Sequence, residues 1–191
     1  MSFLSELRDK KHQLKRTVTI ITRPNGSKVS DDGTTQTEID SIDNYGFVVD
    51  TAPDKIPACI LDDFLYLGSQ DCVDPETIEN YKITHVLSVG IPLPDGSFNA
   101  IVSKYVPALD LPETVLTEIL LTSNRFIGTA KEQNGKVLVH CNAGVSRSAS
   151  VVIGYLIMDC GFSFDEAYGL VKLRRSCVRP NDGFLKQLKK L

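Results

Sequence analysis

A short run of residues, VHCNAGVSRSAS at positions 139–150, constrains the fold of this chain more than any other feature. The β-branched, apolar segment from Lys136 to His140 predicts a buried strand, and the segment from Ser148 to Met158 predicts a buried helix. A loop that leaves a strand and enters a helix turns backbone N–H groups toward its centre, and the helix N-terminus adds about half a positive charge. The run therefore predicts an anion-binding loop within an α/β unit.

The side chains of this loop suit phosphate chemistry. Positive surroundings favour the thiolate form of a cysteine, which makes Cys141 a candidate nucleophile. Arg147 can hold two phosphate oxygens through its rigid fork, and Gly144 tolerates a positive φ close to a ligand. We expect Ser148 to donate a hydrogen bond to the thiolate. We expect His140 to support the loop by hydrogen bonding from the strand end rather than to carry a proton.

The pattern H-C-x-x-G-x-x-R-S between a strand and a helix resembles the signature of the cysteine-dependent protein tyrosine phosphatase superfamily. The full HCNAGVSRSAS resembles the dual-specificity branch, and the small atypical members associated with stress-activated kinase pathways are most similar. Further matching segments extend over about the last three quarters of the chain: LDDFLYLGSQ, ITHVLSV, YVPALDLPET and VKLRRSCVRPNDGFLKQL. The resemblance implies hydrolysis of phosphotyrosine and phosphoserine or phosphothreonine through a phosphocysteine intermediate, without a metal or other cofactor.

The resemblance also assigns roles to residues. The implied phosphate-binding loop consists of Cys141, Asn142, Ala143, Gly144, Val145, Ser146 and Arg147. The leaving oxygen needs a proton donor, and Asp110 matches the family's mobile-loop aspartate, although it could instead cap the following helix. Asp95 is an alternative donor of a type common in turns. Asn181 matches a position that steadies the loop and Arg175 matches a family arginine, but a helix cap and a solvated surface charge explain them equally well.

Length and composition indicate one α/β domain with an extension. A chain of 191 residues is long enough for one such domain and short for two. The sequence shows neither a signal-peptide stretch nor an apolar run that could span a bilayer, so we expect a cytoplasmic protein, with the nucleus as an alternative, and no membrane partner. Its five cysteines form no C-x-x-C pair, which fits free thiols without zinc. One of the other four could trap oxidised Cys141 as a disulfide, or each could be a small buried side chain.

Charge separates the N-terminal part from the rest. Residues 1–30 carry seven Lys or Arg against two acids, whereas residues 31–54 carry seven acids and no Lys or Arg. We expect residues 1–54 to form an extension, which could be a docking arm for a kinase or scaffold, or a variable segment or strand pair lying on the domain. Within it the pattern predicts a basic helix at 5–15, a strand at 17–23 and a flexible acidic linker at 29–44.

Residues 55–191 are expected to form the catalytic domain. Strands are predicted at 64–69, 84–89, 104–109 and 136–140, the first of them at an edge of the sheet. Helices are predicted after Asp74, within 111–135, at 148–158, after the capping box of Ser163 and Glu166, and from Asn181 or Asp182. Such alternation predicts a short mixed or parallel sheet covered by helices on both faces. The resemblance implies the protein-tyrosine-phosphatase-like fold.

Other phosphate-handling classes have less support. The sequence has no G-x-x-x-x-G-K-[ST] element for nucleotide hydrolysis. The loop residues NAGVS carry no lysine or aspartate to meet a multiply phosphorylated lipid ring, and no basic stripe with interleaved aromatic residues suggests a nucleic-acid partner. A scaffold that binds phosphoproteins without turnover would not need nucleophile, arginine and acid together. The resemblance implies phosphoprotein substrates, with MAP or stress-activated kinases or their upstream kinases as candidates, and leaves the oligomeric state open.

Overall fold

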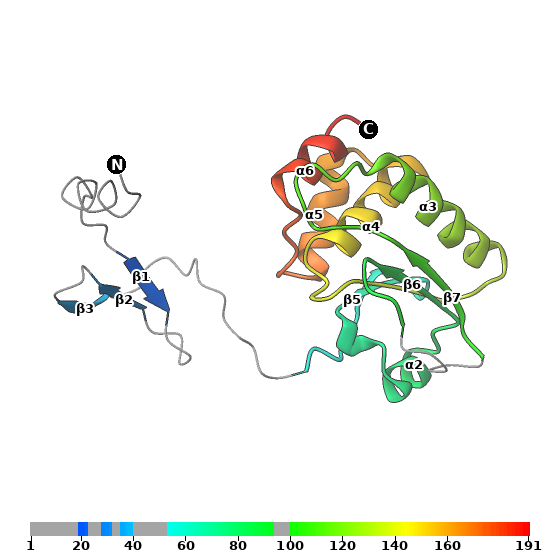
Figure 1. Ribbon diagram of the computed structural model, residues 1–191. Helices are drawn as coiled ribbons and strands as arrows, with labels where there is room; N and C mark the ends of the chain where they lie inside the picture. The colour runs from blue at the N-terminus through cyan, green and yellow to red at the C-terminus, as the bar shows by residue number, and fades with distance from the viewer. Residues whose placement is uncertain (1–18, 23–27, 32–34, 40–52, 94–99) are drawn as a thin grey trace, which may run out of the picture. The chain divides into compact units, whose positions relative to one another are not determined.

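A computed structural model describes residues 19–22, 28–31, 35–39, 53–93 and 100–191 (Figure 1). The chain divides into two compact units, Met1–Ala52 and Pro53–Leu191. Within the described ranges, no helix combines the length and apolar character needed to cross a membrane. The basic helix predicted at 5–15 and the alternative proton donor Asp95 lie outside the described residues.

The N-terminal unit contains a three-stranded antiparallel sheet. Its strands are β1 (Thr19–Thr22), β2 (Lys28–Asp31) and β3 (Gln36–Ile39), in the order β1-β2-β3. The strand predicted at 17–23 is present as β1. The prediction of a flexible linker at 29–44 is wrong where β2 and β3 lie, because β-branched residues alternate there with the polar ones and favour strands despite the acidic composition.

The second unit is built on a mixed five-stranded sheet in the order β4-β5-β8-β6-β7. These strands are β4 (Ala58–Leu61), β5 (Leu65–Gly68), β6 (His85–Val89), β7 (Val102–Val106) and β8 (Val137–His140). Only the β4–β5 pair in this sheet is antiparallel. The predicted mixed sheet is confirmed, but β5 is not an edge strand. A tight turn with Asp63 at a φ of 55° folds β4 back beside it, and the sequence pattern before residue 64 did not predict this hairpin.

Helices cover both faces of the sheet, as predicted (Figure 1). Four of them, α3 (Thr117–Glu132), α4 (Arg147–Met158), α5 (Phe164–Arg174) and α6 (Asp182–Leu188), pack with the larger apolar core. The short helix α2 (Pro75–Tyr81) and the 3-10 turn η1 (Gln70–Cys72) lie with the smaller core on the opposite face. Alternate residues of β8 point to the two cores, so all of its residues are buried.

Local capping signals in the sequence appear where predicted. Asp74 caps α2, Ser163 and Glu166 form a capping box at α5, and Asn181 caps α6. Helix α3 is shorter than the predicted segment 111–135 and begins only at Thr117. Asp110 therefore does not cap it, which removes the structural alternative for that residue.

The first turn of α6 fits tightly against the loop that follows β7. A Cβ atom added at Gly183 would overlap the carbonyl oxygen of Pro112, whereas nothing lies within 4 Å of a Cβ added at Gly169 in α5. We expect Gly183→Ala to lower the free energy of unfolding by about 1–3 kcal/mol through overpacking. Gly169→Ala should leave it unchanged or raise it by up to about 1 kcal/mol. Urea unfolding of the two variants measures the difference, and equal stabilities would contradict this packing.

Candidate active site

The loop between β8 and α4 turns its backbone carbonyls outward. The carbonyl oxygens of residues 142–145 accept hydrogen bonds of 2.8–3.0 Å from the backbone N–H groups of Gln70 and Arg179 and from the side chain of Arg175. In a planar trans peptide the N–H points opposite to the C=O. The N–H groups of residues 143–146 therefore point toward the centre of the loop. This is the anion-binding cradle that the strand–loop–helix pattern predicts.

Gly144 allows this loop to turn beside the end of β5. Its φ is +65°, and an added Cβ would overlap the backbone oxygen of Gly68. The residue is therefore required both for its backbone conformation and for the close approach of the neighbouring strand. Both requirements agree with the role expected from the sequence.

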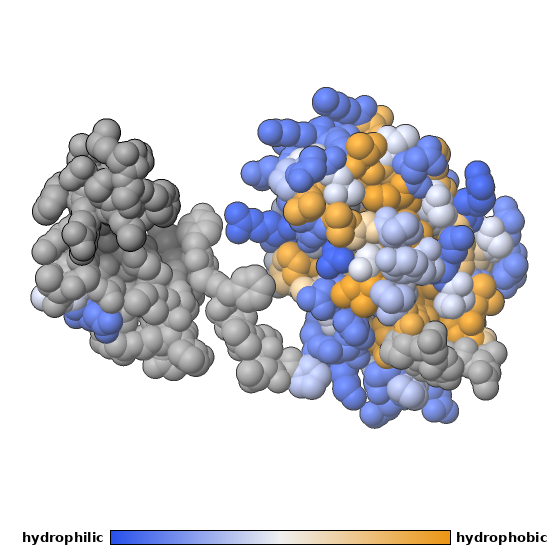
Figure 2. All heavy atoms as spheres, in the orientation of Figure 1, coloured by the Kyte–Doolittle hydropathy of each residue, from blue (hydrophilic) through white to orange (hydrophobic). Residues whose placement is uncertain are grey.

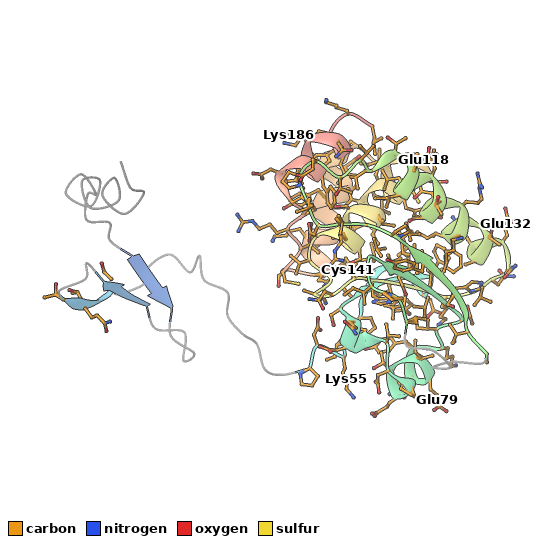
Figure 3. All side chains as sticks on the ribbon, viewed as in Figure 1. Lys55, Glu79, Glu118, Glu132, Cys141 and Lys186 are labelled. Carbon is orange, nitrogen blue, oxygen red and sulfur yellow. The ribbon has the colours of Figure 1, made fainter. Side chains whose placement is uncertain are left out.

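Cys141 lies at the base of the loop, directly after β8 (Figure 3). Its side chain is 2% exposed, and Ser148 Oγ in the first turn of α4 donates a hydrogen bond to Cys141 Sγ over 3.1 Å. A sulfur that accepts from a buried hydroxyl at a helix N-terminus is held in one orientation. The structure thus brings these two predicted residues into contact.

His140, the last residue of β8, connects this strand to β6. Its Nε2 lies 2.7 Å from Ser88 Oγ on β6, and its Nδ1 lies 3.4 Å from the carbonyl oxygen of Cys141. Burial lowers the pKa of His140 to about 4. The ring is therefore neutral near neutral pH, which suits a supporting residue rather than a proton carrier.

Arg147 presents an unsatisfied donor at the loop. Its side chain is 15% exposed, and its Nε lies 3.9 Å from Asp110 Oδ2. Among the described residues, Arg147 Nε is one of three buried side-chain polar atoms without a hydrogen-bond partner. A buried guanidinium N–H without an acceptor is unfavourable. An anion bound in the loop would supply that acceptor.

Asp110 is held over the loop by two donors. Its Oδ1 accepts from Ser146 Oγ at 2.6 Å and from Asn181 Nδ2 at 2.9 Å, whereas its Oδ2 faces Arg147. Because Oδ1 already accepts two hydrogen bonds, a proton on this carboxyl group is best placed on Oδ2. Asn181 also accepts from Phe184 N through its Oδ1 and so caps α6, while its Nδ2 donates to Asp110.

Arg175 is the second site residue, after Asn181, that the sequence left undecided. It is 8% exposed, and its guanidinium donates to the carbonyl oxygens of Ala143 and Gly144 and to the Asp54 carboxylate. Burial opposes its charge, but the hydrogen bond with Asp54 and nearby negative groups raise its pKa above the usual value. A solvated surface charge is therefore the wrong reading. No local pattern could have shown this, because Asp54 lies 121 residues away in sequence.

Asp54 is also missing from the residues predicted to form the site. It is the last residue of the expected extension, yet it lies within the second compact unit. Its carbonyl oxygen accepts from Ser69 Oγ at 2.9 Å and from Cys72 Sγ at 3.1 Å, and its N–H donates to Asp71 Oδ2 at 3.1 Å. These bonds fix the carboxylate that pairs with Arg175.

The other cysteines show no comparable arrangement. All five cysteines are free thiols. Burial raises the pKa of Cys72 and of Cys160, which keeps both in the thiol form. Among the described residues, no group of three His, Cys, Asp or Glu side chains could hold a metal ion.

A hollow of about 280 Å³ lies beside the loop. His140, Pro92 and Leu93 contribute to its wall, and the charged side chains of Lys55 and Asp71 line it as well. Its mixed apolar and charged lining is suited to a polypeptide segment rather than to a purely apolar ligand.

Comparison with known proteins agrees with this geometry. The family described as "Dual specificity phosphatase, catalytic domain" matches residues 65–191. Mouse dual specificity protein phosphatase 19 is 39% identical over 145 residues, which are 75% of this chain and 66% of the relative. Human dual specificity protein phosphatase 6 is 33% identical over 173 residues, which are 85% of this chain and 45% of the relative.

The match therefore spans less than two thirds of the length of these curated relatives. Among solved structures, the crystal structure of DUSP15 superimposes with a TM-score of 0.66 at 30% identity, covering 70% of this chain and 85% of that one. The similarity thus extends from the signature loop through the sheet and the helices around it. The chain belongs to the dual specificity phosphatase family and carries its catalytic domain.

Proposed function

We propose that this protein hydrolyses phosphotyrosine and phosphoserine or phosphothreonine monoesters of other proteins through a phosphocysteine intermediate. One observation carries the proposal: Cys141 Sγ, Arg147 Nε and Asp110 Oδ2 lie at one loop whose N–H groups point inward. Membership of the family supports the same activity.

In the first step, Cys141 Sγ attacks phosphorus in line with the leaving oxygen. The loop N–H groups and Arg147 bind the non-bridging oxygens and stabilise the charge that develops on them. The S–P bond forms while the P–O bond to the substrate breaks, and Asp110 Oδ2 gives its proton to the leaving oxygen. The dephosphorylated side chain then departs as a neutral alcohol or phenol.

In the second step, water attacks the phosphocysteine. The Asp110 carboxylate takes a proton from this water, and the P–S bond breaks. Ser148 Oγ, which lies 3.1 Å from Cys141 Sγ, donates to the departing thiolate. Throughout the cycle, Arg147 and the backbone N–H groups supply the positive charge that other phosphatases take from metal ions.

The substrates that we propose are phosphorylated MAP or stress-activated kinases, or the kinases upstream of them. The support is the resemblance of the signature loop and of YVPALDLPET to the atypical, stress-pathway branch. The absence of lysine and aspartate from NAGVS favours a single phosphate on a protein over a multiply phosphorylated lipid. With such substrates, we propose that the protein acts in the cytoplasm or the nucleus.

Turnover of p-nitrophenyl phosphate in EDTA separates an enzyme from a scaffold that only binds phosphoproteins. We expect turnover to persist in EDTA and to fall by at least about 10³-fold in Cys141→Ser, because the serine hydroxyl is a much weaker nucleophile. Release of phosphate and binding of a phosphotyrosine peptide are measured together. A wild-type protein that binds the peptide and releases no phosphate would be a scaffold.

Replacing Asp110 tests the proton donor. Asp110→Asn keeps an oxygen for Ser146 and Asn181 but cannot donate an acidic proton. We expect kcat to fall by about 10²- to 10³-fold. The limb of the pH–rate profile that descends with rising pH should flatten, because that limb reports loss of the acid's proton. Inhibition by vanadate should change little. An unchanged rate would assign the acid role to another residue.

Replacing Asp54 tests whether its ion pair with Arg175 positions the loop. Without this carboxylate, Arg175 loses the anion that positions it, and the carbonyls of Ala143 and Gly144 are held less firmly. We expect Asp54→Ala to lower kcat/KM about fivefold, which corresponds to roughly 1 kcal/mol, and to weaken vanadate inhibition. Asp54→Asn, which keeps an acceptor oxygen, should recover most of the activity.

A matched control is the exposed ion pair of Asp62 and Arg174, whose atoms lie 3.9 Å apart. Asp62→Ala removes the carboxylate that pairs with Arg174, the residue before Arg175, and leaves the contacts of the loop unchanged. Its kinetics should equal those of the wild type. Equal kinetics for Asp54→Ala and Asp62→Ala would show that Asp54 does not position the loop.

A further inference from the structure

Strand β7 forms one edge of the five-stranded sheet, and no strand of the described residues pairs with its outer side. Val102 N donates to Thr84 O on the β6 side, and Val106 O accepts from Gly90 N on the same side. Because successive residues of a strand alternate in direction, the N–H and C=O groups of Ser103 and Tyr105 point away from β6. Within the described part of the chain, these four groups have no hydrogen-bond partner.

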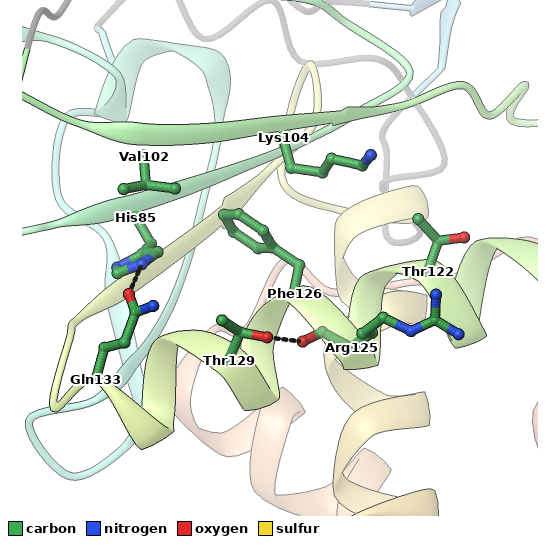
Figure 4. A pocket seen from close by; sticks show the side chains of 8 residues that line it. All are labelled: His85, Val102, Lys104, Thr122, Arg125, Phe126, Thr129 and Gln133. Atoms are coloured by element: carbon green, nitrogen blue, oxygen red, sulfur yellow. Dashed lines mark hydrogen bonds between the residues drawn. The ribbon is translucent and has the colours of Figure 1, made fainter.

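A groove of about 350 Å³ adjoins this edge, between β7 and α3 (Figure 4). Val102 and Phe126 give it an apolar wall, and Val102 is 52% exposed. Figure 2 shows apolar side chains reaching the surface in the region of α3 and β7. An unpaired strand edge beside an apolar wall can pair with an added strand of another chain.

The charged and the apolar residues of this groove lie toward different ends. Lys104 and Arg125 lie with Thr122 toward one end, and Val102 and Phe126 lie toward the other (Figure 4). No acidic side chain belongs to the lining, and in the described ranges neither Lys104 nor Arg125 takes part in an ion pair. The residues three and four positions from Arg125 along α3 are uncharged. Both cations are therefore available to a carboxylate.

We propose that β7 and this groove bind an extended segment of a partner protein in which an apolar residue and an acidic residue stand two positions apart. The segment adds to the sheet beside β7 and exchanges main-chain hydrogen bonds with Ser103 and Tyr105. Residues two apart in a strand point to the same face, as Val102 and Lys104 do. The apolar side chain then contacts Val102 and Phe126, and the carboxylate meets Lys104 and Arg125.

Docking at this edge leaves the catalytic loop accessible. The groove includes His85 and Val102, the first residues of β6 and β7, whereas Cys141 follows the last residue of β8. Strands β6, β7 and β8 are parallel, so the groove extends to the amino end of the sheet and the loop lies at its carboxyl end. The interaction is therefore independent of the chemistry of Cys141.

The test uses the full chain and a fluorescein-labelled peptide of about twelve residues with the repeat Leu-Thr-Glu-Thr, which places Leu and Glu two apart. Fluorescence anisotropy should show saturable binding, weakened by salt because it includes exposed charges. The same peptide with Gln in place of Glu should bind at least about tenfold more weakly, as should the variant Lys104→Glu/Arg125→Glu. Lys186→Glu, a single charge reversal on α6 outside the groove, should bind as the wild type does.

The strand edge is tested separately by Ser103→Pro. Proline removes one outward N–H and is tolerated on an edge strand. This variant should lose peptide affinity while it keeps wild-type turnover of p-nitrophenyl phosphate, which shows that the fold is intact. Absence of saturable binding, or equal binding by Lys104→Glu/Arg125→Glu and Lys186→Glu, would overturn the proposal. So would a dimer of the wild type, seen by sedimentation, that Ser103→Pro abolishes, because the edge would then pair with a second copy.

Discussion

The hydrogen bonds that Arg175 donates to the carbonyl oxygens of Ala143 and Gly144 are the interaction on which the site depends. They turn two peptide units so that their N–H groups face inward, and Gln70 and Arg179 do the same for the neighbouring units. A loop with its carbonyls inward would repel phosphate rather than bind it. The charge of Arg175 is tolerated at 8% exposure because Asp54 neutralises it. The binding cradle is thus held from behind, by residues that touch no substrate.

The front of the site is assembled in a similar way, from a loop that comes from a different part of the chain. Asp110 follows β7, yet Ser146 from the signature loop and Asn181 from the cap of α6 orient its carboxyl group. Since Asn181 also caps α6, the position of the Asp110 carboxyl group is linked to the packing of the last helix. Helix α6 also packs closely against Pro112 of the same loop.

Much of the fold could be predicted because its signals are local. Asp74, Ser163 and Asn181 cap helices through hydrogen bonds to residues three positions away. The continuous apolar run of β8 predicts a buried strand, and all of its residues are buried. The failures have the opposite cause. Strand β4 depends on a hairpin that its own residues did not reveal, and the strands β2 and β3 were hidden by an acidic composition that favours an unfolded segment. The overall composition of a segment does not show the order of its residues, and the alternation of β-branched and polar residues that favours a strand lies in that order.

The sequence by itself determined the chemistry of this protein: a cysteine, a glycine with positive φ, an arginine and a serine spaced along one strand–loop–helix segment. Their spacing sets their contacts, because the backbone between them has few conformations. Only the tertiary structure decided how Arg175 and Asp54 are used, which oxygen of Asp110 faces Arg147, and that β7 forms an edge of the sheet. Those features join residues far apart in the chain, and their geometry follows from how whole elements pack rather than from any local pattern.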